Sequence, residues 1–220
     1  MSLVLSGSTS GSVTLQEPAI AGTTVLDLPA TSGNVVVDSA TQTLTNKSIA
    51  ATQLTGTIAA ARLPTGSVLQ VVQTTMTTTA SVSGSAWNEI TALATSITPT
   101  SASSRILIMP SIDYSASNGY RTGLRLVRNS TEILLGDSAG TRTRASQVGR
   151  FFDSANQMVQ QGNRIYLDSP ATTSATTYRF YLSAETDAGA TLYVNRTVSD
   201  ADGATHFRGT STVVLMEIAS

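Results

Sequence analysis

Apolar residues are sparse in the first third of the chain and form short alternating pieces between turn residues. Leu3 and Leu5, and then Val13 and Leu15, are examples, and Gly, Pro, Ser or Asn follow each piece. Short alternating runs between turn signals predict strands. No aromatic residue occurs before position 67, although large aromatic side chains usually contribute much of a core. The pattern predicts an extended β arm over residues 1–66 that cannot enclose a core alone.

The second half of this arm has an even thinner apolar pattern. Between positions 41 and 66, single apolar residues recur every four or five positions among Thr, Ser, Asn and Ala: Leu44, Ile49, Leu54, Ile58 and Leu63. The β-branched content disfavours disorder, which leaves an arm that lies on a partner or one that winds around its own copies. Three symmetry-related chains would bring enough apolar residues to each step and would cover one another's backbone edges. We expect these residues to form the core of an intertwined homotrimer.

Residues 67–220 carry all the aromatic residues and read as a separate domain. Strand-like runs with turn residues between them lie at 68–73, 89–97, 105–114, 123–127, 132–135, 164–167, 177–183, 191–195 and 211–218. Eight or nine short strands are typical of a β-sandwich or barrel. Alternation along 177–183 places Tyr178, Phe180 and Leu182 on one face. We predict an all-β protein in which residues 67–220 form a sandwich-like knob.

Two of these runs are apolar on both faces, namely Ile106–Met109 and Val213–Met216. A strand of an antiparallel sandwich normally has one face in water. A strand that is apolar on both sides needs a second cover, and the sequence offers no amphipathic helix to supply one. A second copy of the domain is the simplest cover, so we assign Val214 and Met216 to the trimer core.

Two stretches give weaker signals. The alanine run before Arg62 predicts a short helical turn that ends at Pro64 and Gly66, which makes it a hinge between arm and knob. Residues 141–162 show no clear period, and we expect a long loop or a distorted strand there.

Composition excludes several classes of function. Charged residues make up 12% of the chain, against about 25% in ordinary domains, and the net charge is −1 with no basic run. Nucleic acid is therefore not an expected partner. The absence of cysteine removes disulfides and thiolate chemistry. The chain has neither a secretory signal at its start nor the ~18 consecutive apolar residues of a membrane span, so we expect no membrane insertion.

Several segments carry a resemblance to a known class of protein. The stretches GSTSGSVTLQEPAIAGTTVLDLPATSG and TQTLTNKSIAATQLTGTIAAARLP are similar to bacteriophage, including cyanophage, tail-fibre and virion-fibre sequences. The ending RGTSTVVLMEIA resembles the last strand of jelly-roll-like fibre tips. The resemblance implies a trimeric structural protein, made in the host cytoplasm, that mounts on tail or baseplate proteins through its N-terminal part. Its knob would face a host surface polysaccharide. The chain is short for a long tail fibre, so a capsid decoration or head-fibre protein without a receptor role is the alternative.

A loop within the knob has the composition of a binding surface. Asp113, Tyr114, Asn118 and Tyr120 lie among Ser, Ala and Gly, and Tyr, Ser, Gly and Asn make adaptable contacts. A sugar ring can stack on an aromatic face and bond to Asn or Asp, so these four residues are the predicted receptor site. The alternative is that both tyrosines pack at the ends of their strands.

The remaining candidates for chemistry favour ordinary structural roles. His206 is the only histidine, and Asp200 and Asp202 open a turn whose later positions do not continue as a calcium loop. No pair of carboxylates lies in a recognisable frame for glycan hydrolysis, so a depolymerase is a second alternative only. We expect no enzyme, catalytic residue, metal or cofactor.

Two further features could be structural or could contact a ligand. The basic cluster Arg142, Arg144 and Arg150 is either a solvated face or a contact for anionic glycan. Trp87 is the one tryptophan, and we expect it in a core or a subunit interface.

Overall fold

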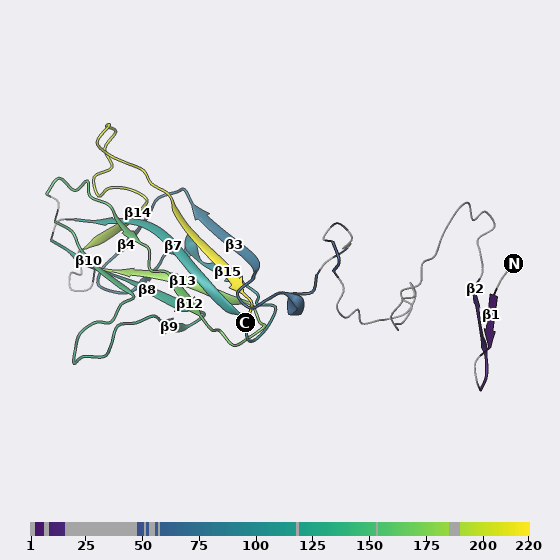
Figure 1. The fold of residues 1–220 in the computed structure, drawn as a ribbon. Coiled ribbons are helices and arrows are strands. Elements are labelled where there is room, and N and C mark those ends of the chain that lie inside the picture. The colour runs from purple at the N-terminus through teal and green to yellow at the C-terminus, as the bar shows by residue number, and fades with distance from the viewer. Residues whose placement is uncertain are drawn as a thin grey trace. The chain divides into compact units, whose positions relative to one another are not determined.

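A computed structural model describes residues 3–6, 9–15, 48–50, 52, 56, 58–117, 119–152, 154–184 and 190–220. The chain divides into two compact units, Met1–Thr55 and Gly56–Ser220. Figure 1 shows both units. Leu44 and Leu54 of the predicted trimer core lie outside the described residues. Of the others, Ile49 is 47% exposed and Ile58 is 53% exposed, whereas Leu63 is half-buried.

The described part of the first unit contains one hairpin. Strand β1 (Leu3–Ser6) pairs antiparallel with β2 (Ser12–Leu15). The connecting turn includes Gly11, whose φ of 80° belongs to the left-handed region that glycine adopts without steric cost. The alternating apolar pairs of the sequence therefore do form strands here.

The second unit is all-β and consists of two antiparallel sheets (Figure 1). The larger sheet has the order β3-β15-β7-β14-β4, and two further strands pair with β7. Its strands are β3 (Val68–Met76), β4 (Ala80–Ser83), β7 (Arg105–Ala116), β11 (Gln160–Gly162), β12 (Tyr166–Asp168), β14 (Thr191–Val194) and β15 (Ser211–Ile218). The described residues include no helix long and apolar enough to cross a membrane.

The smaller sheet has the order β10-β8-β13-β5, with β6 paired to β13 and β9 paired to β8. Its strands are β5 (Asn88–Glu89), β6 (Thr95–Ile97), β8 (Arg121–Arg128), β9 (Thr131–Ile133), β10 (Gln147–Arg150) and β13 (Thr176–Ser183). The turn between β8 and β9 contains Asn129 at a φ of 53°, a conformation that asparagine tolerates better than most residues.

The core lies between the inner faces of the two sheets. Tyr178, Phe180 and Leu182 of β13 are at most 1% exposed, which confirms the predicted alternation of that strand. From the larger sheet, the inward side chains of β7 and β15 join the same core, and they include Ile108 and Leu215. The sandwich-like character expected from the strand count is therefore present in the second unit.

The outer face of the larger sheet is also apolar near its centre. The register places Met216 opposite both Val71 of β3 and Leu107 of β7, and Leu107 is opposite Leu167 of β12. Paired residues point to the same side of a sheet, so these four residues form one row across four strands. Val214 lies next to Met109 in the neighbouring row. Val71 is 56% exposed and the other members are half-buried.

The prediction of one continuous strand over residues 89–97 is wrong. The 3-10 turn η3 (Thr91–Leu93) interrupts it and separates β5 from β6. The turn places Leu93 in the core with no exposed surface. Ile90 is also buried, and it lies three positions before Leu93. Strict strand alternation cannot place both side chains on one face, so their joint burial accounts for the break.

The region 141–162 contains two short strands, β10 and β11, at facing edges of the two sheets. Glutamine side chains connect these edges: the Gln147 amide donates to the Gln161 carbonyl at 2.8 Å, and the Gln160 amide donates to the Arg150 carbonyl at 3.0 Å. The distorted-strand interpretation is therefore closer to the structure than a long loop. Side-chain bonds of this kind satisfy edge groups that a strand ladder would otherwise fill.

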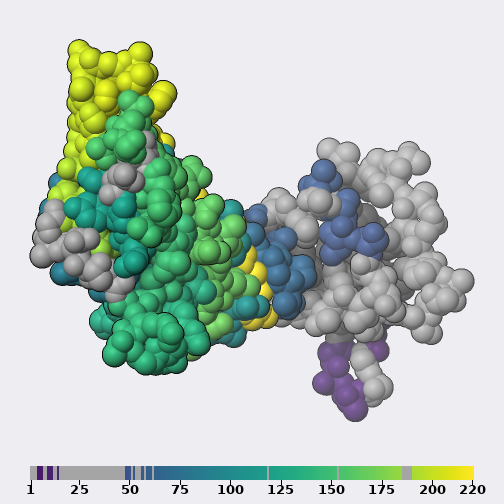
Figure 2. Space-filling view, turned by 90° about the vertical axis from the view of Figure 1, so that its left-hand side faces the viewer, coloured from purple at the N-terminus to yellow at the C-terminus, as the bar shows by residue number. Residues whose placement is uncertain are grey.

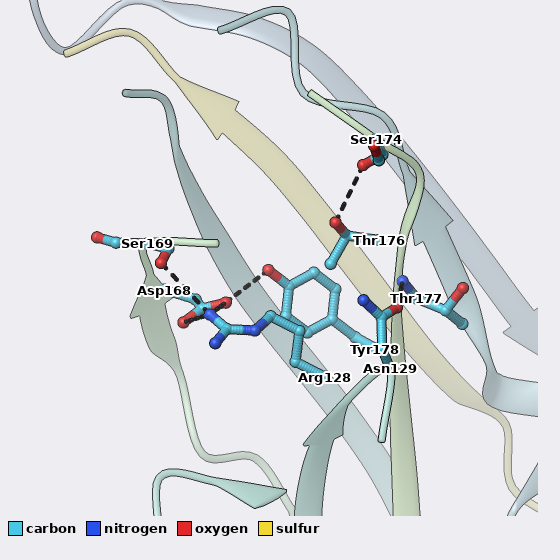
Figure 3. A network of polar contacts seen from close by, with 8 residues as sticks. All are labelled: Arg128, Asn129, Asp168, Ser169, Ser174, Thr176, Thr177 and Tyr178. Carbon is cyan, nitrogen blue, oxygen red and sulfur yellow. Dashed lines mark hydrogen bonds and ion pairs between the residues drawn. The ribbon is translucent and has the colours of Figure 1, made fainter. Parts of the chain in front are cut away.

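A polar network ties the two sheets together inside the sandwich (Figure 3). Asp168 of β12 accepts from Arg128 of β8, with Nη1 lying 2.9 Å from each carboxylate oxygen. The Tyr178 hydroxyl of β13 donates to the same carboxylate at 2.8 Å. Burial raises the pKa of the Tyr178 phenol, and the bond to Asp168 raises it further, so this tyrosine remains a neutral donor.

A second buried carboxylate lies at the end of β15. Glu217 has no exposed surface. Its oxygens accept from Gln70 Nε2 at 2.6 Å and from both the backbone nitrogen and the hydroxyl of Thr100 at 2.7 Å. Burial by itself raises the pKa of this carboxyl, but the hydrogen bonds outweigh burial and hold the pKa below its ordinary value of 4.5.

This lowered pKa predicts an acid-sensitive contribution to stability. The contribution is present above pH 4.5 and is lost as the pH falls through the folded-state pKa, because the unfolded chain then binds the proton more readily. We expect Glu217→Gln to be less stable than the natural chain at pH 7 and the gap to narrow at pH 3, as measured by urea unfolding at both pH values. Asp137→Asn, at an exposed position, is the control, and a gap of the same size at both pH values would contradict the prediction.

Candidate functional site

The structure does not bring Asp113, Tyr114 and Tyr120, the described residues of the predicted receptor site, together on one surface. Strand β7 continues to Ala116, so Asp113 and Tyr114 lie within it and point to opposite faces. Tyr114 has no exposed surface and packs edge-on against Phe151, with ring centroids 5.9 Å apart. Its assignment as a surface contact is therefore wrong, and burial raises its pKa. Tyr120 is half-buried against the core, and Asn118 lies outside the described residues.

Asp113 instead lines a small hollow beside the segment between β14 and β15. The hollow has a volume of about 260 Å³ and also includes Phe207, which is 68% exposed. Figure 2 shows this segment, in yellow, standing out from the rest of the unit. Asp200 within it is ion-paired to Arg196 at 2.7 Å and to Arg208 at 2.6 Å. Burial raises the pKa of Asp200, but the two arginines outweigh it and leave the pKa lowered.

The better candidate for a site lies on the outer face of the smaller sheet. Trp87 stands here, with the tip of its six-membered ring against Gly123 of β8. A Cβ at position 123 would lie 2.5 Å from the ring atom at that tip, Cη2. Glycine is therefore required for the indole to approach the strand this closely. The Arg125 guanidinium covers the indole, with its carbon 3.9 Å from the ring centroid, a cation–π contact.

The segment between β9 and β10 forms the other wall of this site. Arg125 Nε donates to the Arg144 carbonyl at 2.9 Å, and Arg125 also forms an ion pair with Glu132 of β9. The Arg144 Nε donates to the Gly136 carbonyl at 2.6 Å. Ser146 accepts from the Leu126 backbone at 2.9 Å. These bonds hold the segment against β8 and fix where its arginines lie.

Together these elements enclose an open hollow of about 470 Å³, here called the Trp87 hollow. It is lined by Ser85, Trp87, Arg125, Glu132, Leu135, Arg142, Thr143 and Arg144. Its volume is within the range of small-molecule sites. Three arginines and one glutamate give the lining a formal charge of +2, whereas the whole chain carries −1. Positive charge is therefore concentrated at this place.

One neighbouring pair of charges on the same face is already matched. Arg179 of β13 is ion-paired to Glu89 at 3.2 Å, and the Tyr181 hydroxyl donates to Glu89 at 3.1 Å. Burial raises the pKa of Tyr181, and the bond to Glu89 raises it further. The Arg142 and Arg144 side chains differ, because within the described part of the chain their bonds go to backbone carbonyls and not to a carboxylate. The described residues hold no cluster of three metal-ligating side chains.

Comparison with known protein families gives no match, and comparison with curated proteins gives no match either. Of the predicted basic cluster, the structure brings Arg142 and Arg144 into the hollow. Arg150 lies apart and stacks on Phe152, with its guanidinium carbon 4.7 Å from the ring centroid. Sequence reasoning missed Arg125 and the position of Trp87. The only signal in the sequence was the glycine between two arginines in Arg121–Arg128, since a glycine within a strand often marks a place where another group approaches closely.

Proposed function

We propose that this chain is a structural fibre protein of a bacteriophage virion. Three copies assemble, the N-terminal arm mounts on tail or baseplate proteins, and the second unit presents a surface to host polysaccharide. Support comes from the sequence resemblance of the arm and from the two-sided apolar strands of the second unit.

The outer apolar row of the larger sheet is the observation that carries this proposal. Val71, Met216, Leu107 and Leu167 lie side by side on the face that does not enter the core. Apolar groups gathered on one outer face mark an interaction surface in soluble proteins. If copies meet through this face, the outer apolar side chains of β7 and β15 are buried against another copy. Closed symmetry lets every copy use the same patch.

The attachment role is tested by competition. Purified full-length chain, added in excess to host cells, is expected to block adsorption of virions that carry it, because both use the same receptor. Several identical sites per fibre strengthen weak single contacts through avidity. A large excess of free chain is therefore needed to block adsorption of the virion. Unchanged adsorption would reject the attachment role and favour a capsid decoration protein without a receptor.

A further inference from the structure

We propose that the Trp87 hollow binds the carboxylate-bearing ring of an acidic saccharide, such as a uronic acid. This inference rests on the proposed attachment function and specifies its ligand class. The predicted tyrosine loop plays no part in it, since Tyr114 is buried and Tyr120 packs against the core.

The charge of the hollow points to an anion. Glu132 engages Arg125, which leaves Arg142 and Arg144 as the arginines of the lining without a carboxylate partner in the described residues. Asp137 is exposed on the same segment but does not line the hollow. A guanidinium presents a planar set of donors that matches a carboxylate, often through two parallel bonds. Two such groups beside one hollow form a site for a negatively charged group.

Both arginines are partly fixed before any ligand arrives. Arg144 Nε donates to the Gly136 carbonyl at 2.6 Å, and Arg142 Nη1 donates to the Ala139 carbonyl at 3.2 Å. These bonds use one donor of each guanidinium and leave the others for a ligand. Fixing a long side chain in advance lowers the entropy lost on binding.

The uncharged part of the lining suits a sugar ring better than a bare inorganic anion. Trp87 and Leu135 supply apolar surface, while Ser85 and Thr143 supply hydroxyl groups. Sites for small organic ligands combine such apolar walls with a few polar groups that fix orientation. A phosphate or sulfate ion would contact the arginines but would make no use of the apolar surface of Trp87 and Leu135.

Tryptophan fluorescence tests the proposal directly, because Trp87 is the only tryptophan of the chain and lines the hollow. The full-length protein is titrated with trigalacturonate and trimannuronate, and in parallel with neutral galactotriose and with inorganic phosphate. We expect a saturable change of emission with an acidic trisaccharide, roughly tenfold weaker binding of the neutral one, and weakening at high salt. No saturable change with either acidic trisaccharide, or equal binding of phosphate alone, would overturn the proposal.

Variants locate the site. Arg142→Gln combined with Arg144→Gln is expected to weaken acidic-trisaccharide binding at least tenfold, while Arg105→Gln, at an exposed position on the other sheet, leaves binding unchanged. Gly123→Ala is an independent test, because the added methyl group displaces the indole while every arginine remains. Circular dichroism checks that each variant is folded. Binding retained by folded double and Gly123→Ala variants would overturn the site.

Failure of this inference can be told apart from failure of the attachment role. If the chain competes with virions for host cells but binds no acidic trisaccharide, the ligand class is wrong and attachment stands. If the trisaccharide binds but adsorption is unchanged by excess chain, the hollow is an acidic-sugar site and the attachment role is wrong.

Discussion

Replacing Met216 by glutamate is expected to lower the mass of the protein in solution from about 68 kDa, three copies of 22.8 kDa, to that of one copy. Met216 lies at the centre of the outer apolar row, between Val71 and Leu107. A glutamate on this face would bring three carboxylates into the proposed interface. Burying an unpaired charge costs several kcal/mol, which is enough to separate copies held mainly by apolar contact. Light scattering on the purified protein measures the mass.

The control for this experiment carries the same charge elsewhere. Ser81→Glu lies at an exposed position on β4 of the same sheet, away from the apolar row, and should keep the mass of three copies. Position 216 faces away from the core, so we expect both variants to keep their strands. Circular dichroism checks this. A mass near 22.8 kDa for the unaltered protein would reject the trimer. A folded Met216→Glu variant that stays at 68 kDa would show that this face is not needed to hold the copies together.

Replacing Asp168 by alanine is expected to destabilise the second unit by about 3 kcal/mol. Asp168 is 4% exposed and accepts from both Arg128 and Tyr178. Its removal leaves a fully buried phenol without an acceptor and a guanidinium without a carboxylate. Each buried unsatisfied group costs about 1–3 kcal/mol. The Arg128 side chain is 26% exposed, so water compensates part of its loss.

Two comparison variants show how much of this loss comes from the Tyr178 hydrogen bond and how much any exposed Asp→Ala change would cause. Tyr178→Phe keeps the ion pair and removes one hydrogen bond, so we expect a loss of about 1 kcal/mol. Asp202→Ala, at an exposed position, should be within about 0.5 kcal/mol of the natural chain. Urea unfolding gives the free energies. An Asp168→Ala loss no larger than that of Asp202→Ala would show that the network adds nothing to stability.

The residues of the Trp87 hollow show how far sequence reasoning can go towards a site. Arg142 and Arg144 stand close together in the chain and were visible as a cluster. Arg125 and Trp87 are far from them in sequence, and the pairing of β8 with its neighbours is what brings them to the same place. The tyrosine loop misled for a related reason, because β7 runs on past Asp113 and its alternation turns Tyr114 inward.

The all-β, sandwich-like character of the second unit, the inward face of β13 and the two-sided apolar character of β7 and β15 could be predicted from the residues alone. Those properties depend on residue period and on side-chain type, which are local. The interruption of 89–97, the glutamine bonds between β10 and β11, and the Arg128–Asp168–Tyr178 network were decided only by the tertiary structure. Each depends on which strands become neighbours and in what register, and residues far apart in the chain acquire a common environment only after the sheets have packed.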